Sequence, residues 1–252
     1  MEELYRPITR VGKPLIFMKR ESAEIVKYAS NAFLATKISF INMLTEFCEV
    51  TGANIRDVAT GMGLDNRIGP RFLHAGIGYG GSCFPKDVKA LMATAKELNL
   101  DLSIIEATDR INTRERHRFF EKILKALPAK AHVGILGLSF KPKTDDMREA
   151  PSLDLIPMLI AAGHTVTTHD PFAMENAKKL LPNSVRFVGS PMEAVKDADA
   201  AVLLTEWDIF RGIDLVEMKK MMKGKDLFDG RNVYEPKEVE AAGLRYTGIG
   251  VS

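Results

Sequence analysis

The chain has 252 residues, 46% of them apolar, which is enough to bury one large core or two modest ones. Its 35 basic and 33 acidic residues nearly balance, and this argues against binding to nucleic acid or to a membrane surface through charge. The only cysteines, Cys48 and Cys83, cannot form a disulfide framework. No apolar run is long enough to span a bilayer and no signal peptide is evident, so we expect a cytoplasmic protein.

The first half of the chain has the pattern of helices. We expect residues 1–20, which contain Pro7 and Pro14, to form an extended lead-in. Residues 22–50 lack proline and glycine, and Gly52 follows as a C-cap, which predicts one long helix. Beyond its first third this helix is apolar on nearly every face, so we expect it to lie in a core or in a dimer interface. Shorter helices are predicted at 54–61, 85–98 and 103–127.

A glycine-rich stretch, Phe-Leu-His-Ala-Gly-Ile-Gly-Tyr-Gly-Gly-Ser-Cys-Phe-Pro-Lys-Asp, occupies residues 72–87. Glycine can take positive φ and lets backbone N–H groups approach a ligand closely, so this stretch predicts a ligand-binding loop. Cys83 precedes the helix that opens at Pro85, where the helix dipole and Lys86 favour a reactive thiolate. The alternative on these features alone is a small buried cysteine in a surface loop.

Beyond Pro128 short β-rich runs alternate with helical patterns. We predict strands at 132–140, 165–169, 186–188, 201–204 and 227–228, and helices at 153–162, 174–181, 191–196 and 215–222. This alternation is typical of a doubly wound parallel sheet, giving an α/β fold overall. Residues 133–139, Val-Gly-Ile-Leu-Gly-Leu-Ser, form a weakened dinucleotide fingerprint that lacks its third glycine, and we assign no dinucleotide to it.

Residues 80–87, Gly-Gly-Ser-Cys-Phe-Pro-Lys-Asp, resemble the catalytic cysteine loop of the UDP-glucose/GDP-mannose dehydrogenase family. Three other segments resemble family signatures in the right order: 24–33, 140–152 and 228–232. The form of the loop is most similar to members that act on UDP-glucose. The resemblance implies an all-helical dimerisation domain at 21–128, after the lead-in, and a Rossmann-like UDP-sugar-binding domain at 129–252.

The resemblance also implies roles for individual residues. Cys83 would be the nucleophile, Lys27 would stabilise an oxyanion, Asn31 would hold an oxygen of the substrate or of water, and Asp87 would help to remove a proton. Arg67 would reach UDP-glucose across a subunit boundary, which implies a homodimer. The other expected substrate-binding residues are Phe72, His74, Gly76, Gly78, Tyr79, Gly80, Phe140, Lys141 and Arg231. The expected contacts with the cofactor NAD are Lys86 and Arg148, and no metal is expected.

Family members begin with an NAD-binding Rossmann domain, and nothing in this sequence resembles it. We therefore expect this chain alone to be inactive. One alternative is a non-catalytic, dimerising UDP-binding module, and another is a dehydrogenase of a different nucleotide sugar such as GDP-mannose. A third is an unrelated thiol hydrolase in which one of five histidines serves Cys83: His74, His117, His132, His164 or His169.

Overall fold

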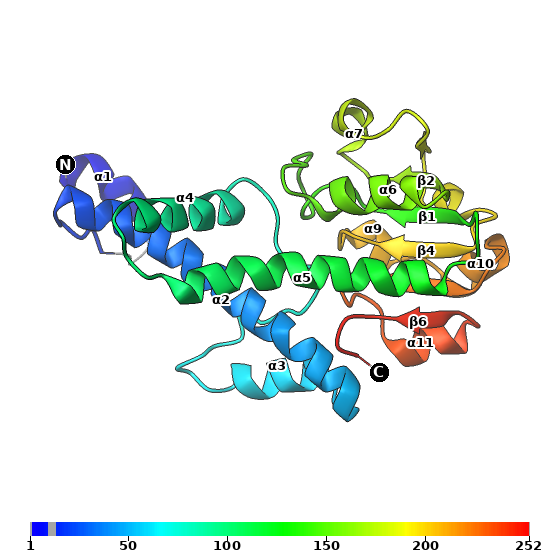
Figure 1. Cartoon of the computed structure of the whole chain (residues 1–252), viewed down its shortest axis with the longest axis horizontal. Helices are drawn as coiled ribbons and strands as arrows, with labels where there is room; N and C mark the ends of the chain where they lie inside the picture. Colours follow the sequence, from blue (N-terminus) through cyan, green and yellow to red (C-terminus); the bar gives the residue numbers. More distant parts are fainter. Residues whose placement is uncertain (1, 10–13, 252) are drawn as a thin grey trace.

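The computed structural model describes residues 2–9 and 14–251, which form a helical half and a sheet half (Figure 1). The helical half contains α1 (Glu2–Thr9), α2 (Arg20–Thr51), α3 (Ile55–Gly63), α4 (Phe84–Glu97) and α5 (Ser103–Ala126). The two long helices are α2 and α5, and α5 runs on from the helical half to lie beside the sheet. This helix therefore belongs to both halves.

The helix α2 is the long central helix that the sequence predicts. It ends at Gly52, which takes a left-handed conformation (φ 75°) and donates its N–H to the Cys48 carbonyl. Its buried positions lie between Ala32 and Cys48, and α2 packs against both α4 and α5. Within the described residues, 2–9 and 14–251, no helix is long and apolar enough to cross a membrane.

The predicted extended lead-in is wrong for residues 2–9, which form the helix α1. Pro7 lies inside this helix and removes one backbone donor, the feature that suggested an extended segment. Loss of one donor costs little in so short a helix, because the first four N–H groups of any helix lack an intrahelical partner and few such bonds are formed here. Residues 14–19 are non-helical, as expected, and Gly12 lies outside the described residues.

The sheet half is built on six parallel strands in the order β3-β2-β1-β4-β5-β6. This is the strand order of dinucleotide-binding Rossmann sheets. The predicted α/β fold with a helical region and a parallel sheet is confirmed. The strands are β1 (His132–Leu136), β2 (Thr165–His169), β3 (Arg186–Phe187), β4 (Ala200–Leu203), β5 (Asp226–Asp229) and β6 (Arg245–Thr247).

Helices cover both faces of the sheet. One face packs against the end of α5, α6 (Pro151–Ala161) and α7 (Met174–Leu180), around Phe119, Val133 and Leu155. The other packs against α8 (Pro191–Val195), α9 (Asp208–Arg211), α10 (Leu215–Met221) and α11 (Pro236–Ala241). The sequence patterns missed α9, α11 and β6, because elements of 4, 6 and 3 residues are too short to display a period.

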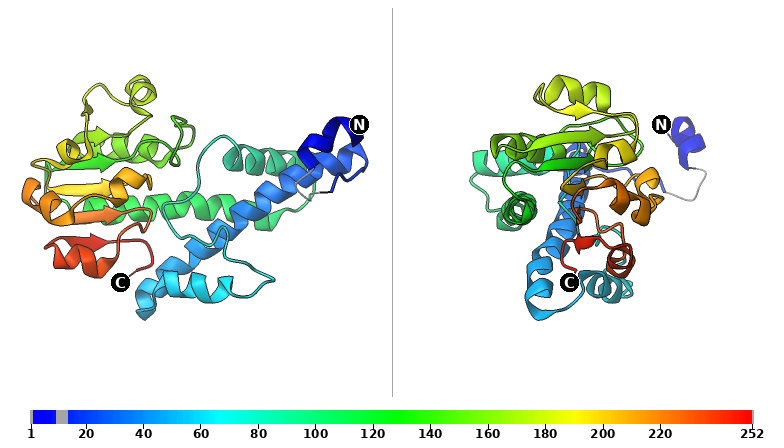
Figure 2. Two further views of the ribbon diagram at one scale, coloured as in Figure 1. Left: turned by 180° about the vertical axis from the view of Figure 1, so that it is seen from behind. Right: turned by 90° about the vertical axis from the view of Figure 1, so that its right-hand side faces the viewer.

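The end of the described chain returns from the sheet to the helical half. Gly250 donates its N–H to Glu49 of α2 at 2.8 Å and accepts the Ile55 N–H at 2.9 Å. Val251 is buried against Ile41 and Ile55. Both views of Figure 2 accordingly place the C-terminal end beside α2 and α3. The two halves are thus linked by this segment as well as by α5.

Candidate active site

Cys83 occupies the N-cap position of α4, and its side chain is exposed. Its carbonyl accepts the Asp87 N–H at 2.8 Å, which starts the helix. Pro85 follows in the first turn, where its missing N–H needs no partner. The sulfur therefore stands at the positive end of a helix and faces solvent, whereas Cys48 is buried. The alternative of a buried cysteine is wrong for Cys83.

Asp87 lies one turn into α4, and its side chain is fully buried. One carboxylate oxygen accepts hydrogen bonds from Lys27 and Asn31 of α2, each at 2.6 Å, and the other accepts one from Lys86. Burial alone would raise the pKa of Asp87, but these three donors outweigh it and hold that pKa well below its usual range. Three of the four predicted catalytic side chains, those of Lys27, Asn31 and Asp87, therefore form one cluster with Asp87 at its centre.

A cavity of about 440 Å³ lies between the two halves, and α4 contributes Phe84 to its lining. Four of its lining residues were not predicted: Ile38, Arg71, Phe84 and Glu206. The other lining residues are all the predicted substrate contacts except Arg67, namely Phe72, His74, Gly76, Gly78, Tyr79, Gly80, Phe140, Lys141 and Arg231. Of the four that were missed, Glu206 follows the carboxyl end of β4, a position where open α/β sheets bind ligands, so its location gave a usable signal.

The glycines of the loop allow the two walls of the cavity to meet. A Cβ on Gly80 would lie 2.3 Å from the Glu149 carbonyl oxygen, and one on Gly81 would lie 2.5 Å from the Phe140 ring. Gly81 also has φ 85° and donates its N–H to the Arg148 carbonyl at 2.8 Å. These contacts require glycine, because any side chain would separate the cysteine loop from the segment that follows β1.

Arg231 holds together three segments around the cavity. Its guanidinium donates to the carbonyls of Leu204 at 2.8 Å, Gly78 at 3.0 Å and Phe140 at 3.1 Å. Its Nε also lies 3.3 Å from Glu206 Oε2. Burial lowers the pKa of Arg231, partly offset by the charge of Glu206. In this structure Arg231 organises the cavity walls; its predicted contact with substrate stays a prediction.

Seven predicted site residues lie outside the lining of this cavity: the four catalytic ones and three others, Arg67, Arg148 and Lys86. Arg67 is exposed and paired with Asp65 at 2.6 Å. Arg148 is exposed and paired with Asp146, whose hydrogen bond raises the pKa of Arg148. The hydrogen bond to Asp87 is the main cause that raises the pKa of Lys86. Both Arg148 and Lys86 lie near enough to Cys83 for their charges to interact with its thiolate.

The Rossmann-like sheet does not offer a free dinucleotide crevice. Asp170, directly after β2, is fully buried and accepts the N–H groups of Leu138 at 2.7 Å and Ser139 at 3.1 Å. In dinucleotide-binding folds an acidic residue near this position reads the ribose, and N–H groups after the first strand bind the pyrophosphate. Here these groups bind one another, so NAD does not fit this crevice.

Two other kinds of site find no support in the described part of the chain. Within residues 2–9 and 14–251 no group of three or more histidine, cysteine or acidic side chains could hold a metal ion. The hydrogen-bonding contact found for the Cys83 sulfur within those ranges is with Ser82 Oγ at 3.8 Å, not with a histidine. Within the described residues no histidine hydrogen-bonds to Cys83, as the thiol-hydrolase alternative would require.

Comparison with known families agrees with this architecture. The model of the central domain of the UDP-glucose/GDP-mannose dehydrogenase family matches residues 21–114, and that of the family's UDP-binding domain matches residues 134–236. The chain belongs to the UDP-glucose/GDP-mannose dehydrogenase family. The resemblance drawn from the cysteine loop is thereby confirmed.

Relatives within the UDP-glucose/GDP-mannose dehydrogenase family include UDP-glucose 6-dehydrogenases from two bacteria. The protein of Rhizobium meliloti (strain 1021) is 46% identical, over 99% of this chain and 58% of its own length. TuaD of Bacillus subtilis (strain 168) is 44% identical, over 99% of this chain and 54% of its own length. The chain thus spans little more than half the length of these curated relatives.

Solved structures of the family have the same fold. A UDP-glucose dehydrogenase from Pyrobaculum islandicum aligns with a TM-score of 0.86 at 37% identity, covering 100% of this chain and 55% of that one. A UDP-D-ManNAc dehydrogenase from Pyrococcus horikoshii aligns with a TM-score of 0.83 at 29% identity, covering 99% of this chain and 56% of that one. Relatives with different named sugars thus share this architecture.

Proposed function

We propose that this chain is the sugar-binding and catalytic-cysteine part of an NAD-dependent UDP-glucose 6-dehydrogenase. The observation that carries the proposal is the position of Cys83 at the start of α4, the helix that also bears Asp87 of the Lys27–Asn31–Asp87 cluster and lines the cavity at Phe84. The cavity suits a nucleotide sugar because glycine backbone, an aromatic ring and Lys141 meet in it.

The reaction converts the sugar 6-alcohol to a carboxylate through an aldehyde. When bound, NAD would supply the hydride acceptor for both oxidations, and Lys86 and Arg148 are the residues of this chain expected to contact it. Between the two oxidations the Cys83 thiolate forms a carbon–sulfur bond to the aldehyde carbon, and the carbonyl π electrons move to its oxygen. The aldehyde's own hydrogen can then leave this tetrahedral carbon as hydride in the second oxidation, as the C=O bond of a thioester forms. The resulting thioester is split by water, which gives the carboxylate of UDP-glucuronate and returns the thiolate.

The Asp87 cluster has a separate task in this scheme. Oxygen becomes negative when the alcohol loses its proton and again when the thiolate adds, and the Lys27 ammonium and the Asn31 amide are the donors that stabilise it. Asp87 has a pKa too low for it to hold a proton well at neutral pH. We therefore assign it to orienting Lys27 and Lys86, with a water molecule accepting the proton of the sugar hydroxyl.

Calorimetric titration of the purified chain with UDP-glucose tests the binding part of the proposal. We expect UDP-glucose to bind, Lys141→Ala to weaken that binding, and GDP-mannose to bind more weakly. Absence of binding, or equal affinity for both nucleotide sugars, contradicts the assignment to UDP-glucose. The chemical step is tested with the aldehyde form of the substrate. The wild-type chain should form an adduct at Cys83 that mass spectrometry detects, and the Cys83→Ser variant should not.

A non-catalytic, dimerising UDP-binding module is the second candidate. The closed crevice at Asp170 favours it for the chain taken alone, because no productive NAD site is formed there. Reaction of Cys83 with the aldehyde form of the substrate separates the two functions, because neither function requires this chain alone to bind NAD. Binding of UDP-glucose without an adduct at Cys83 would support the module over the dehydrogenase part.

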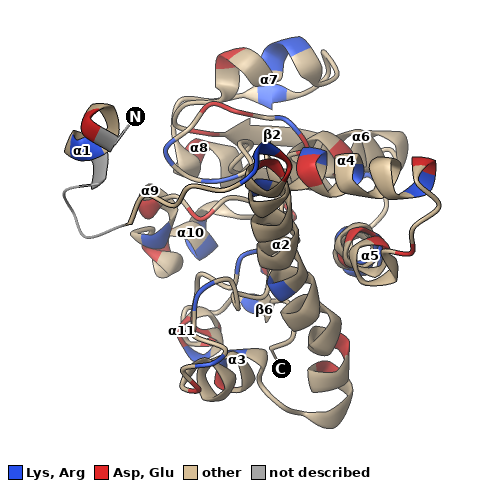
Figure 3. Cartoon of the chain, turned by 90° about the vertical axis from the view of Figure 1, so that its left-hand side faces the viewer, with Lys and Arg blue, Asp and Glu red and all other residues tan. Residues whose placement is uncertain are grey.

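A homodimer formed through α2 belongs to the same proposal. Several large apolar side chains on this helix are exposed, and they recur at intervals of seven and three to four residues: Val26, Phe33, Phe40, Met43, Phe47 and Val50. Such a repeat is typical of a seam between helices. Figure 3 shows the ribbon of α2 largely free of charge along its middle. A second copy of the chain would cover this face.

Mixing two defective variants tests whether the dimer shares its sites through Arg67. Arg67→Ala and Lys141→Ala should each bind UDP-glucose weakly. If Arg67 acts on the partner's cavity, random exchange of subunits restores about a quarter of the sites, because half of the dimers are mixed and each has one intact site. No restoration would mean that Arg67 acts within its own subunit or not at all.

A further inference from the structure

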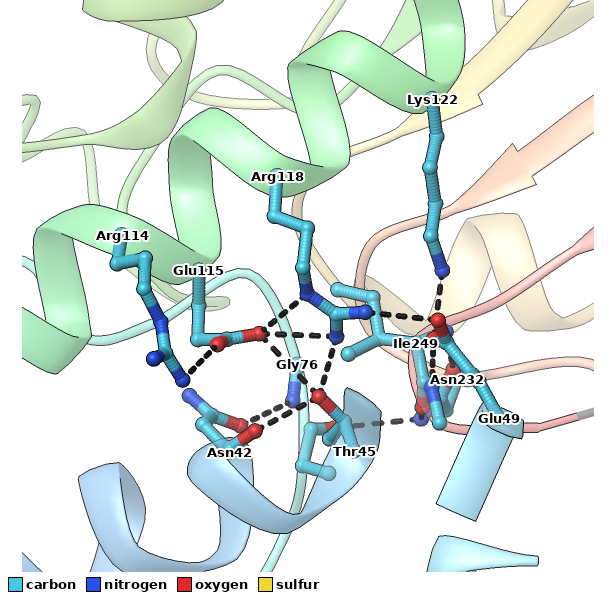
Figure 4. A network of polar contacts seen from close by, with 12 residues as sticks. Asn42, Thr45, Glu49, Gly76, Arg114, Glu115, Arg118, Lys122, Asn232 and Ile249 are labelled. Atoms are coloured by element: carbon cyan, nitrogen blue, oxygen red, sulfur yellow. Dashed lines mark hydrogen bonds and ion pairs between the residues drawn. The ribbon is translucent and has the colours of Figure 1, made fainter. Parts of the chain in front are cut away.

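The shape of the glycine loop is set by side chains of the long helices rather than by the loop itself. Asn42 of α2 accepts the Gly76 N–H at 2.9 Å, a contact seen in Figure 4. Asn112 of α5 accepts the Tyr79 N–H at 2.9 Å and donates its amide N–H to the Tyr79 carbonyl at 3.1 Å. Asn112 thus pairs with a backbone residue as a neighbouring strand would.

Asn112 is nearly fully buried, at 6% exposure, and its amide orientation follows from chemistry: a backbone N–H must face the oxygen and a carbonyl must face the nitrogen. The contact also explains Gly78, which has φ 93° and lies so close that a Cβ would be 2.5 Å from Asn112 Oδ1. Tyr79, which lines the cavity, is therefore fixed against α5 through both its N–H and its carbonyl.

Arg116 extends this contact to the other wall of the cavity. It lies one helical turn after Asn112 and donates to the carbonyls of Tyr79 at 2.6 Å and Glu149 at 2.9 Å. Glu149 belongs to the segment that contains Phe140 and Lys141. The same face of α5 therefore fixes the glycine loop relative to the segment after β1.

We propose that Asn112 is a positioning residue, which holds the glycine loop in the form that binds a nucleotide sugar and presents Cys83. This rests on the proposed function, since it assigns a task within the UDP-glucose site. Asn112 does not line the cavity and acts on the ligand only through the backbone of Gly78 and Tyr79. A preformed loop binds more tightly, because ligand binding then does not have to order it.

Asn112→Asp tests this with the smallest change of shape. The carboxylate still accepts the Tyr79 N–H, but it cannot donate and it opposes the Tyr79 carbonyl with a negative charge. We expect the dissociation constant for UDP-glucose to rise at least about tenfold. Amide hydrogen exchange should quicken in the peptide 75–82 while α2 and α5 keep their protection. The control is Asn183→Asp, at an exposed position in the loop before β3.

Each outcome decides the matter. Wild-type affinity and wild-type exchange in Asn112→Asp overturn the proposal. Faster exchange throughout α2 and α5 with unchanged UDP-glucose affinity of the folded protein means a merely structural role, and also overturns it. If the wild-type chain binds no UDP-glucose, the proposed function fails. Amide hydrogen exchange in the peptide 75–82 then still tests whether Asn112 holds the glycine loop. Should Asn112→Asp not fold, the neutral Asn112→Ser carries the same expectations.

Discussion

Both halves of the molecule contain fully buried aspartates, and two of these, Asp87 and Asp170, are held in different ways. Asp87 in the helical half accepts hydrogen bonds from three side chains, those of Lys27, Asn31 and Lys86. Asp170 in the sheet half is surrounded mainly by backbone N–H groups and one indole, from Leu138, Ser139, Phe172, Ala173 and Trp207. The first carboxylate meets movable cations, and the second meets fixed dipoles.

This difference separates chemistry from architecture. The lysines on Asp87 keep 59% and 62% of their side chains exposed, so they can reach a ligand and exchange protons. The donors on Asp170 cannot move without changing the ends of β1 and β2. Loss of Asp170 would leave buried N–H groups without a partner, whereas loss of Asp87 would leave lysines that water can solvate.

The largest effect on stability is expected for Asp170→Ala. Several buried donors lose their acceptor together, so the free energy of unfolding should fall by about 3–5 kcal/mol. Urea denaturation followed by circular dichroism measures this directly. A matched control is Asp208→Ala, since Asp208 is exposed in the first turn of α9 and the change should stay within about 0.5 kcal/mol. Equal effects of the two substitutions would remove the contrast between the halves.

Asp87→Asn should have a smaller effect on stability, less than about 1 kcal/mol at neutral pH, because the lysine heads are solvated. The pKa of Asp87 is depressed in the folded state, so its charge stabilises the fold above the unfolded pKa of about 3.9 and stops doing so as pH falls through the folded pKa. The difference in unfolding free energy between wild type and Asp87→Asn should therefore be constant above about pH 5 and shrink in acid.

The same substitution should abolish most adduct formation between Cys83 and the aldehyde substrate, since Lys27 loses its anchor. Adduct yield by mass spectrometry at pH 7 provides the measurement. A variant that forms the adduct as well as wild type would show that Asp87 is as architectural as Asp170.

More of the helical half than of the sheet half could be predicted from the sequence. The long helix, the glycine loop and the helix after Cys83 each have a local pattern, and family resemblance connected Lys27 and Asn31 with Asp87 before any geometry was known. Their meeting in one cluster agrees with that expectation, although their roles in catalysis stay predictions. In the sheet half the alternation of β-rich runs with helical patterns placed β2 to β5 to within two residues at each end. The first strand was predicted too long, at 132–140, because β1 ends at Leu136 and the chain turns at Gly137, which has φ 92°.

The residues that the sequence did not reveal act on backbone groups far away in the chain. Asn112 is an ordinary polar position of a helix until Tyr79 is placed beside it. Asp170 follows a strand, where dinucleotide-binding folds have an acid that binds the ribose. No feature of the sequence near it indicates that its carboxylate accepts hydrogen bonds from the N–H groups after β1. Long-range pairing of side chain with backbone leaves no periodic signal.

The smallest expected effect concerns Tyr28, which sharpens the description of the Asp87 cluster. The ammonium groups of Lys27 and Lys86 lie 5.1 Å and 5.9 Å from the centre of its ring. Tyr28→Leu removes this cation–π contact and should lower stability by about 0.5–1 kcal/mol at low salt, whereas Tyr28→Phe keeps the ring and should change little. The pKa of Asp87, followed by NMR of its carboxyl carbon, should rise in Tyr28→Leu alone, because lysines that are held less firmly stabilise the carboxylate less. If both variants titrate as wild type does, Asp87 orients the lysines without help from the ring, and the cluster depends on its carboxylate alone.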